Sequence, residues 1–162
     1  KNVGYVFQDA DSQLFMSTVF DDVAFAPRNY GMSEAEVNEK TMEALKVVHI
    51  EQLKDKQIYK LSGGEKKLAS IATILSTEPD VILMDEPSVA LDPKNRRNLI
   101  NILNRLNQAK IIASHDLNMI MDTCERTILL SDGKIIKDGN TKEILLDKEL
   151  MEESGLELPL GY

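Results

Sequence analysis

The sequence is short of cysteine and of long hydrophobic runs, and each shortage excludes a class of protein. Cys124 is the only cysteine among 162 residues, so no internal disulfide can form, which fits a reducing cytosol. No run approaches the roughly 18–20 consecutive apolar residues that a membrane-spanning helix requires. No signal-peptide pattern opens the chain. We therefore expect a protein that neither crosses a membrane nor depends on disulfides.

Basic residues are scarce relative to acidic ones. Lysine and arginine total 19 against 27 aspartates and glutamates, which gives a net charge of −8. A nucleic-acid-binding protein usually carries a basic stripe, so this balance argues against that partner. It does not exclude ATP, because a few local donors can hold a phosphate on an acidic protein. The length suits one domain, or one domain of two small lobes, and the 43% hydrophobic content is enough for a core.

The phosphate-binding loop G-x-x-x-x-G-K-[ST] is missing from these 162 residues. Gly133-Lys134 is the only Gly-Lys pair, but Ile135 follows it and Ile128 stands where the first glycine of the loop is needed. The chain also begins at Lys1, without methionine, directly in strand-like sequence. We interpret this beginning as that of a fragment, a processed chain or an engineered chain.

The first half of the sequence is predicted to be mostly helical, up to about Thr77. Residues 2–7 form an apolar run typical of a short buried strand, and residues 14–26 form a mixed apolar stretch that we expect to stop at Pro27. Two capping boxes, Ser33–Glu36 and Ser62–Glu65, predict helix starts. Their inward faces are predicted to carry Val37, Thr41, Leu45 and Val48 in one helix and Leu68, Ile71, Ala72 and Leu75 in the other.

The second half alternates strands and helices. Residues 81–84 and 110–114 are predicted as buried strands of a parallel sheet, and Asp92-Pro93 begins the helix between them. Ser131-Asp132-Gly133 is a hairpin signal, and a single helix is expected from Thr141 to near Gly155. The predicted fold class is α/β, with a truncated, mostly parallel sheet that is partly exposed.

Two adjacent carboxylates follow the predicted strand 81–84. Hydrolysis of ATP requires Mg²⁺ to neutralise phosphate charge and a group that orients or deprotonates the attacking water. Asp85, at the carboxyl end of a buried strand, can hold the metal, and Glu86 can address the water. Acids at strand ends often do no more than cap the next turn. The segments that follow, Ser88–Asp92 and His115, favour the functional interpretation.

Ser62-Gly63-Gly64 precedes a predicted helix. A helix N-terminus offers unpaired amides to an anion, and two glycines let the backbone approach a phosphate closely. Alone, this segment is better explained as a plain capping box. It gains weight because it lies ahead of the Asp85-Glu86 strand.

Three further features complete the candidate chemistry. His115 follows a predicted strand and can contact a γ-phosphate, although a lone histidine is more often structural. Gln8 at a strand end can touch metal and water, although such a glutamine most often faces solvent. Four nearby acids are interpreted as a solvated face: Asp9, Asp11, Asp21 and Asp22.

In their order along the chain, these motifs resemble those of ABC ATPases. Gln8, Leu61–Glu65, Val81–Glu86, Ala90–Asp92 and His115 resemble the Q-loop, signature, Walker B, D-loop and H-loop of that family. The resemblance covers essentially the whole chain. Four shorter segments are similar in particular to the cobalt/nickel and energy-coupling-factor import ATPases: Val3–Gln8, Ser12–Phe15, Asp22–Phe25 and Ser154–Pro159.

The resemblance implies a role for each matching residue, with ATP and Mg²⁺ as cofactors. Asp85 would hold Mg²⁺ through water, Glu86 would be the catalytic carboxylate, and His115 would contact the γ-phosphate. Gln8 would sense metal and nucleotide and relay to a membrane subunit. Two groups act toward a partner: Ser62, Gly63 and Gly64 would bind the γ-phosphate held by it, and Asp92 would work across the dimer interface.

The resemblance also implies an organisation and partners. A helical signature subdomain would cover residues 9–77, and a RecA-like α/β core would cover 1–8 and 78–162. The partners would be a second ABC ATPase subunit, identical or different and bound head to tail, and an integral membrane transporter subunit. The membrane subunit would dock in a groove beside Gln8 that includes Phe15 and Ala26-Pro27. No nucleic acid is implied, and the protein would lie peripherally on the cytoplasmic face of the membrane.

The sequence departs from the family pattern where the phosphate loop is missing, and more modestly at Ser88 and Ala90, where threonine and glycine are more usual. We expect this chain alone to bind ATP weakly or not at all and to be inactive. The main hypothesis is the ATPase subunit of a cobalt/nickel or energy-coupling-factor importer. Two alternatives stay open: a soluble ABC-class ATPase of DNA maintenance or translation, and a non-catalytic module that donates its signature face.

Overall fold

The computed structural model describes residues 3–161, and the chain divides into two compact units, Lys1–Ala113 and Ser114–Tyr162. The described part of the first unit contains three strands and four α-helices: β1 (Val3–Val6), α1 (Val19–Asn29), α2 (Glu34–Val47), α3 (Gly63–Leu75), β2 (Val81–Asp85), α4 (Pro93–Arg105) and β3 (Ala109–Ala113). Short 3₁₀ turns lie at Ala10–Ser12, Glu51–Leu53 and Ile58–Lys60. The second unit contains α5 (Leu117–Thr123), β4 (Arg126–Ser131), β5 (Lys134–Asn140), α6 (Thr141–Leu145) and α7 (Lys148–Glu153).

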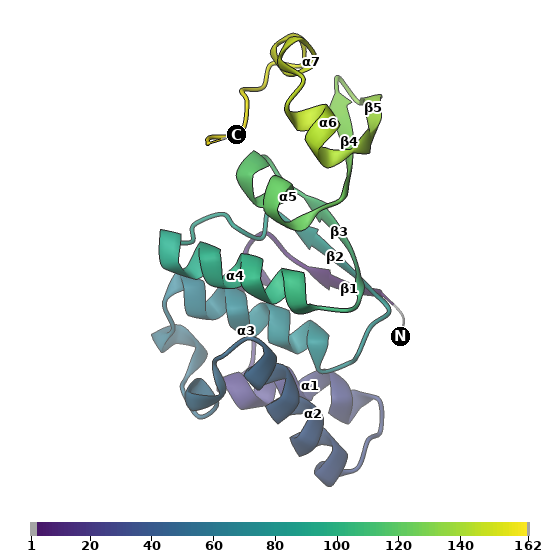
Figure 1. Cartoon of the computed structure of the whole chain (residues 1–162). Helices are drawn as coiled ribbons and strands as arrows, with labels where there is room; N and C mark the ends of the chain where they lie inside the picture. The colour runs from purple at the N-terminus through teal and green to yellow at the C-terminus, as the bar shows by residue number, and fades with distance from the viewer. Residues whose placement is uncertain (1–2, 162) are drawn as a thin grey trace. The chain divides into compact units, whose positions relative to one another are not determined.

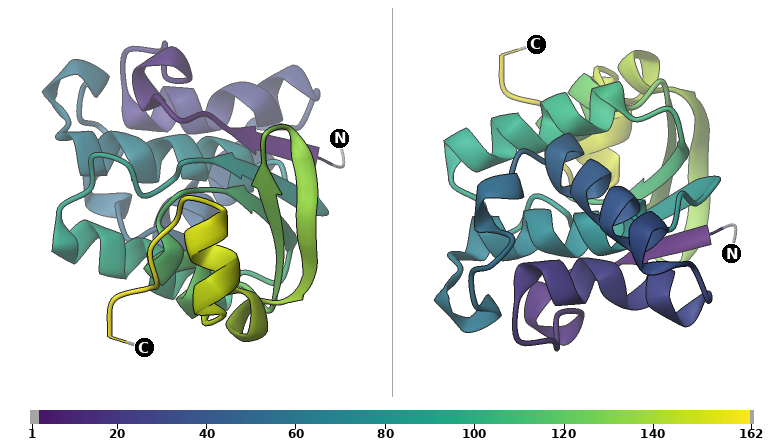
Figure 2. Two further views of the ribbon diagram at one scale, coloured as in Figure 1. Left: turned by 90° about the horizontal axis from the view of Figure 1, so that it is seen from above. Right: turned by 90° about the horizontal axis from the view of Figure 1, so that it is seen from below.

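A parallel three-stranded sheet organises the first unit. The strand order is β1-β2-β3, with Val3 paired to Val81 and Val81 paired to Ala109. Both crossovers step across the sheet in the same direction, and crossovers of this kind are almost always right-handed. Their helices α3 and α4 are therefore expected on the same side of the sheet, where Figures 1 and 2 show them. The predicted α/β fold with a parallel sheet is confirmed.

The two faces of this sheet differ in burial. Val6, Ile82 and Met84 are buried on the side of the helices. Gly4 is on that side too, and a Cβ there would collide with Cγ2 of Ile74 in α3, so only glycine allows this approach. On the opposite side Tyr5, Leu83 and Ile111 form a row across the three strands.

That row is incompletely covered. Tyr5 is 44% and Ile111 63% exposed, so the expected partial exposure of the sheet is confirmed. The prediction that residues 110–114 form a buried strand is wrong, because β3 is an edge strand of the described sheet and alternates exposed with half-buried residues. Apolar composition therefore indicated the strand correctly but not its burial.

Helix α1 runs through Pro27 instead of stopping there. A proline inside a helix removes one i→i−4 hydrogen bond, here the one to the carbonyl of Val23. The hydroxyl of Ser76 at the end of α3 donates to that carbonyl at 2.9 Å, so the oxygen stays satisfied although it is buried. The predicted stop at Pro27 is wrong because Ser76, 53 positions from Val23, supplies the missing donor.

Both predicted capping boxes are present. Ser33 caps α2 and Ser62 caps α3, and in each case the side chain accepts from the third amide while that glutamate accepts from the cap amide. The predicted inward residues are buried: Val37, Thr41, Leu45 and Val48 along α2, and Leu68, Ile71, Ala72 and Leu75 along α3. Helices α1, α2 and α3 pack on one another and form most of the helical part of the first unit (Figure 1).

The second unit is an antiparallel hairpin followed by two short helices. Asp132 and Gly133 have φ angles of 50° and 72°, the left-handed pair that a two-residue hairpin turn requires, so the predicted hairpin is confirmed. The single C-terminal helix predicted from Thr141 is wrong. The chain breaks after Leu145, because Asp147 caps a new helix by accepting from the amide of Leu150.

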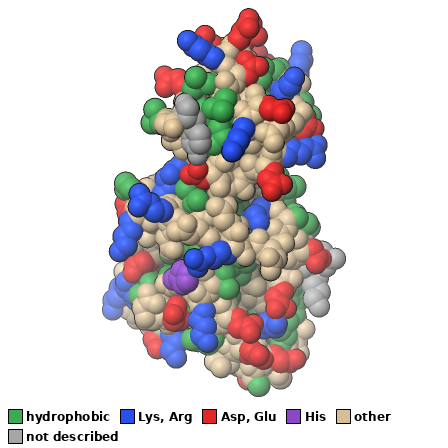
Figure 3. Space-filling model, viewed as in Figure 1, with side chains coloured by type: hydrophobic (Ala, Val, Ile, Leu, Met, Phe, Trp, Pro, Cys, Tyr) green, Lys and Arg blue, Asp and Glu red, His purple; other side chains and the backbone are tan. Residues whose placement is uncertain are grey.

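Within residues 3–161, none of the helices is both long and apolar enough to reach across a bilayer. Acidic and basic side chains are interspersed over the face of the first unit shown in Figure 3. The boundary at Ala113 separates compact units, and the predicted subdomains 9–77 and 1–8 with 78–162 stay predictions.

Candidate functional site

The carboxyl ends of β1 and β2 bring three predicted site residues to one edge of the sheet. Val6 pairs with Met84, and Gln8 and Glu86 each follow two residues later. Asp85 is the last residue of β2 and is half-buried. Because parallel neighbouring strands end at the same edge, Gln8, Asp85 and Glu86 all lie at this end of the sheet. Gln8 itself is exposed.

Glu86 adopts an unusual backbone conformation. Its φ angle is +43°, in the left-handed region that a residue with a Cβ avoids, and such conformations cost of order 1–3 kcal/mol. Its amide donates to the carbonyl of Ala113 at 2.9 Å, which extends the β2–β3 ladder by one residue. Strain of this kind concentrates at functional sites, where the surrounding structure holds it in place. The conformation sets the direction of the Glu86 side chain where β2 ends.

Ala90 shares this conformation, with a φ angle of +63°. Glycine adopts this conformation without the steric cost that a Cβ imposes. The physical reason for the glycine that is more usual at this position is therefore visible here, and the alanine carries a strain that glycine would remove.

The N-terminus of α3 carries the Ser62-Gly63-Gly64 segment. Ser62 Oγ accepts from the amide of Glu65 at 3.3 Å, and Glu65 Oε2 accepts from the amide of Ser62 at 2.7 Å. Burial alone would raise the pKa of Glu65, but the bonds from the Ser62 amide and from Lys56 Nζ outweigh it and lower that pKa. The amides of Gly63 and Gly64 have no acceptor among the described residues, so they remain available to an anion.

The two glycines differ in their surroundings. A Cβ at Gly63 would meet nothing within 4 Å, and this residue has an ordinary helical conformation. A Cβ at Gly64 would lie 2.5 Å from Nδ2 and 3.3 Å from Cβ of Asn95 in α4. Gly64 is therefore required by packing against α4, whereas nothing in the described fold requires glycine at position 63.

Asp92 acts as the N-cap of α4. Its Oδ1 accepts from the amides of Lys94 and Asn95 at 2.9 Å each, and its Oδ2 accepts from Asn95 Nδ2 at 2.6 Å. The Asn95 amide, and then its side chain, are the main causes of the lowered pKa of Asp92. The predicted cap is confirmed, while the predicted action of Asp92 across a dimer interface stays a prediction.

His115 lies in the second unit, two residues after β3 ends at Ala113. The two units are described separately, so its predicted approach to Glu86 and to a γ-phosphate stays a prediction. The other histidine, His49, is exposed at the end of α2 and has a φ angle of +59°.

The four acids interpreted as a solvated face do not all behave alike. Asp22 is only 3% exposed, and its carboxylate accepts from the amides of Phe15 and Met16 at 3.2 and 3.1 Å. Burial raises the pKa of Asp22 although those two bonds oppose the shift. The interpretation is wrong for Asp22, which fixes the loop ahead of α1. That loop presents Phe15, 64% exposed, in edge-to-face contact with Phe25.

Two residues to which the sequence analysis assigned no role contact the predicted site. Lys67 Nζ donates to the carbonyls of Phe7 and Gln8 at 3.0 and 2.6 Å. Gln13 Oε1 accepts from the amide of Phe7 at 3.0 Å. A signal for Lys67 was available, because it lies three residues after Gly64 and four before Ile71, on the inward face of α3. A lysine on that face marks a buried polar contact.

Asp85 and Gln8 offer a donor set that suits Mg²⁺. Residues 3–161 contain no group of three or more histidine, cysteine or acidic side chains placed to bind a metal. Mg²⁺ does not require such a group, since it is usually held by one or two carboxylates together with waters and substrate phosphates. The carboxylate of Asp85 and the amide oxygen of Gln8 at one sheet edge fit this pattern.

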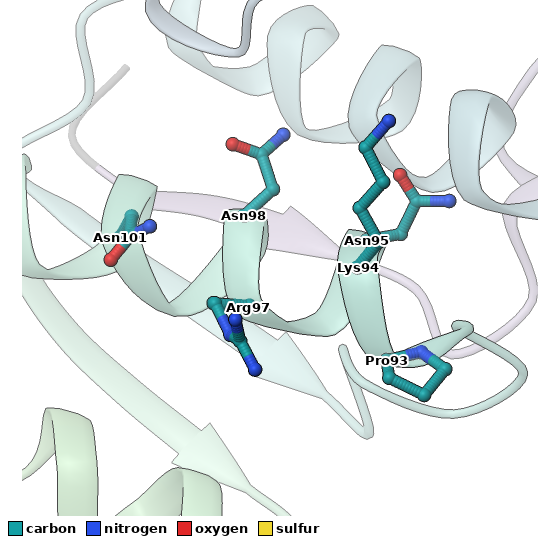
Figure 4. A pocket seen from close by; sticks show the side chains of 6 residues that line it. All are labelled: Pro93, Lys94, Asn95, Arg97, Asn98 and Asn101. Atoms are coloured by element: carbon teal, nitrogen blue, oxygen red, sulfur yellow. The ribbon is translucent and has the colours of Figure 1, made fainter.

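A separate cavity of about 450 Å³ lies along one side of α4 (Figure 4). None of the six residues that line it is a predicted catalytic or metal-binding residue. They are Pro93, Lys94, Asn95, Arg97, Asn98 and Asn101. We assign no ligand to this cavity.

Comparison with known proteins finds ABC transporter ATP-binding proteins that match almost the whole chain. The family model described as "ABC transporter" matches residues 1–89. A protein of Geobacter sulfurreducens named as an ABC transporter ATP-binding protein is 49% identical over 161 residues, covering 99% of this chain and 65% of that protein. The energy-coupling factor transporter ATP-binding protein EcfA of Carboxydothermus hydrogenoformans is 42% identical, covering 99% of this chain and 60% of its own length.

A solved structure gives the same answer for the fold. The structure of cbiO1 from Clostridium perfringens, described as part of the ABC transporter complex cbiONQ, superposes with a TM-score of 0.84 at 37% identity. The match covers 94% of this chain and 62% of that one. The chain thus spans less than two thirds of the length of each of these three proteins.

Proposed function

Because this chain belongs to the ABC transporter family of ATP-binding proteins, we propose that it is part of an ATPase subunit that powers solute uptake across a membrane. In the intact protein this part supplies the groups that act on metal, water and a partner's phosphate. The phosphate-binding loop that the 162 residues lack comes from elsewhere in that protein. The solute is a metal ion such as cobalt or nickel, or a vitamin, as for energy-coupling-factor importers.

The observation that carries the proposal is the grouping of Gln8, Asp85 and Glu86 at one sheet edge, with Glu86 held at a φ of +43°. Asp85 and the amide oxygen of Gln8 are the groups that would hold Mg²⁺, which would neutralise phosphate charge. Glu86 accepts a hydrogen bond from the attacking water and orients it toward the γ-phosphate.

The signature segment acts on a second subunit. The amides of Gly63 and Gly64 and the hydroxyl of Ser62 lie at the positive end of α3, where they suit the γ-phosphate of ATP bound by the partner. Each site is then completed by the opposite subunit, and two subunits bind head to tail. Asp92, at the cap of α4, lies close to this segment through the contact of Asn95 with Gly64.

The loop around Phe15 is the docking site for the membrane subunit. Phe15 and Phe25 form an exposed aromatic pair whose ring centroids lie 4.8 Å apart. Buried Asp22 fixes the backbone of this loop. An exposed, rigid aromatic pair is well suited to receive a helix of a membrane protein. Through this contact the protein binds peripherally to the cytoplasmic face of the membrane.

The experiment that tests the catalytic assignment uses the intact gene product with Glu86→Gln. The amide keeps the shape of the side chain but loses the basic carboxylate, so ATP should bind without being hydrolysed. We expect turnover to fall by about a hundredfold or more. An ATP-bound dimer should accumulate, measured by light scattering with and without ATP.

Glu78→Gln is a matched control. Glu78 also has a positive φ, +48°, and lies just ahead of β2 at its other end, where it pairs with Lys40. This variant should hydrolyse ATP as the wild type does. Normal turnover in Glu86→Gln would contradict the role of Glu86. An intact wild-type protein that hydrolyses no ATP would overturn the ATPase proposal and leave the signature-donating module.

Membrane association is tested separately by Phe15→Ala. The exposed Phe15 ring contributes little to core packing, so the variant should fold and keep ATP turnover. It should no longer co-purify with the membrane subunit. Tyr59→Ala, which removes a 74% exposed ring elsewhere in the first unit, is the control. Equal co-purification of the Phe15 variant and the wild type would refute the docking site.

A further inference from the structure

The segment that follows β1 is tied to α3 by side chains from both. Lys67 Nζ, on α3, donates to the carbonyls of Phe7 and Gln8 at 3.0 and 2.6 Å. These contacts join residues 59 and 60 positions apart. They fix the backbone of Gln8 itself, not its side chain, to the helix that begins at Ser62–Gly64.

Gln13 makes the reciprocal connection. Its Nε2 donates to the carbonyl of Ser70 at 2.7 Å and to Thr73 Oγ1 at 2.8 Å, both on α3. Its Oε1 accepts from the amide of Phe7 at 3.0 Å. The carbonyl of Phe7 is therefore held by Lys67 and its amide by Gln13, so the backbone of Phe7 cannot shift relative to α3 without losing several hydrogen bonds.

Burying the ammonium group of Lys67 is unfavourable, so packing alone does not explain a lysine at this position. It is only 3% exposed, and burial lowers the pKa of Lys67 although the carboxylates of Asp9 and Asp85 oppose the shift. Its ammonium group forms no ion pair within 4 Å in the described part of the chain. An apolar side chain of similar volume at such a position often leaves a fold equally or more stable. The two carbonyl bonds are what the lysine provides and an apolar residue does not.

The position of Lys67 along α3 connects Gln8 with the phosphate-binding segment Ser62–Gly64. It lies five residues after Ser62, which is about 7.5 Å along the helix axis at 1.5 Å per residue. We propose that Lys67, supported by Gln13, is a positioning residue that makes Gln8 move as one body with the Ser62–Gly64 segment. Docking of a partner's phosphate on α3 thereby sets the place of Gln8 at the metal. This inference rests on the proposed function.

The test uses the intact protein with Lys67→Met, which keeps the apolar stem and removes the ammonium. Amide hydrogen exchange of residues 7–13 should accelerate by about tenfold or more, because their link to α3 is lost. The Mg²⁺ concentration that half-saturates ATP hydrolysis should rise, and kcat should fall, each by about tenfold. Lys67→Gln, which keeps an amide donor, should restore part of both and serves if the methionine variant does not fold.

Lys40→Met is the matched control. It removes one lysine and one contact, the 2.6 Å ion pair with Glu78, but touches neither β1 nor α3. Its exchange in residues 7–13 and its Mg²⁺ dependence should equal those of the wild type.

Each outcome decides the proposal. Unchanged exchange in Lys67→Met overturns the link, and faster exchange with unchanged Mg²⁺ dependence overturns the positioning of Gln8. Equal effects in the Lys40 variant also overturn it, because they indicate a general loss of stability. An intact wild type without ATPase activity refutes the proposed function and with it the positioning of Gln8 for catalysis, while the exchange measurement then still decides the physical link.

Discussion

Replacing Gly63 by alanine should greatly lower ATP turnover in the intact protein without weakening its fold, whereas the same change at Gly64 should weaken the fold itself. Both residues lie in the first turn of α3, one position apart. The change is one methyl group in each case. The two variants therefore separate a glycine required by a ligand from a glycine required by packing.

The magnitudes follow from what each methyl group meets. At Gly63 the new Cβ lies in open space, and alanine is favoured over glycine in helices by roughly 0.5–1 kcal/mol, so the free energy of unfolding should stay equal or rise slightly. At Gly64 the new Cβ lies 3.3 Å from Cβ of Asn95 and closer to its amide, whose bond to Asp92 must break. Overpacking and the lost bond together should cost about 1–2 kcal/mol.

The assay has two readings on each variant. Urea unfolding gives the change in stability from the midpoint at constant slope. Steady-state hydrolysis of ATP gives the functional loss, which we expect to reach about a hundredfold for Gly63→Ala, because a methyl group at the phosphate-facing surface displaces the anion from the Gly63 and Gly64 amides. Wild-type turnover in a folded Gly63→Ala protein would refute phosphate docking at this segment. Wild-type stability in Gly64→Ala would refute the packing argument.

Three further predictions concern the fold around the site. Ala90→Gly should raise the free energy of unfolding by about 0.5–1 kcal/mol, because relief of the +63° conformation outweighs the added entropy of the unfolded chain; a lower urea midpoint would contradict it. Ser76→Ala should cost about 1–3 kcal/mol, since the Val23 carbonyl then has neither this hydroxyl nor the amide that Pro27 lacks, and Ser76→Thr, which keeps the hydroxyl, is the comparison. Folding lowers the pKa of Glu65 from 4.5, so the contribution of Glu65 to stability is present above pH 4.5 and is lost as the pH falls through the folded-state pKa. Glu65→Gln should therefore flatten the acid side of the plot of stability against pH. An unchanged plot would argue against this assignment.

Local chemistry made much of the fold predictable. A capping box contains both of its partners within four residues, so Ser33–Glu36 and Ser62–Glu65 indicated two helix starts correctly. The Asp132-Gly133 turn likewise depends only on its own backbone conformation. The carboxyl-end grouping of Gln8 with Asp85 followed from a general property of parallel sheets.

The features that the sequence did not predict depend on distant residues. The passage of α1 through Pro27 requires the hydroxyl of Ser76, and the buried contacts of Lys67 require backbone carbonyls 59 and 60 positions away. Asp22 looked like one more surface acid, because the amides that it accepts from are exposed only by the shape of its loop. Neither composition nor periodicity contains these pairings.

The +43° conformation of Glu86 has a consequence for how such a protein changes over many generations. Glycine and asparagine accept the left-handed region far more readily than glutamate, so a change to either relieves strain while it removes the carboxylate. In a duplicated copy that no longer needs to hydrolyse ATP, replacement of Glu86 by either residue would therefore increase the stability of the fold. We expect silent paralogues to carry glycine or asparagine here more often than alanine, and to melt at higher temperature than their active counterparts.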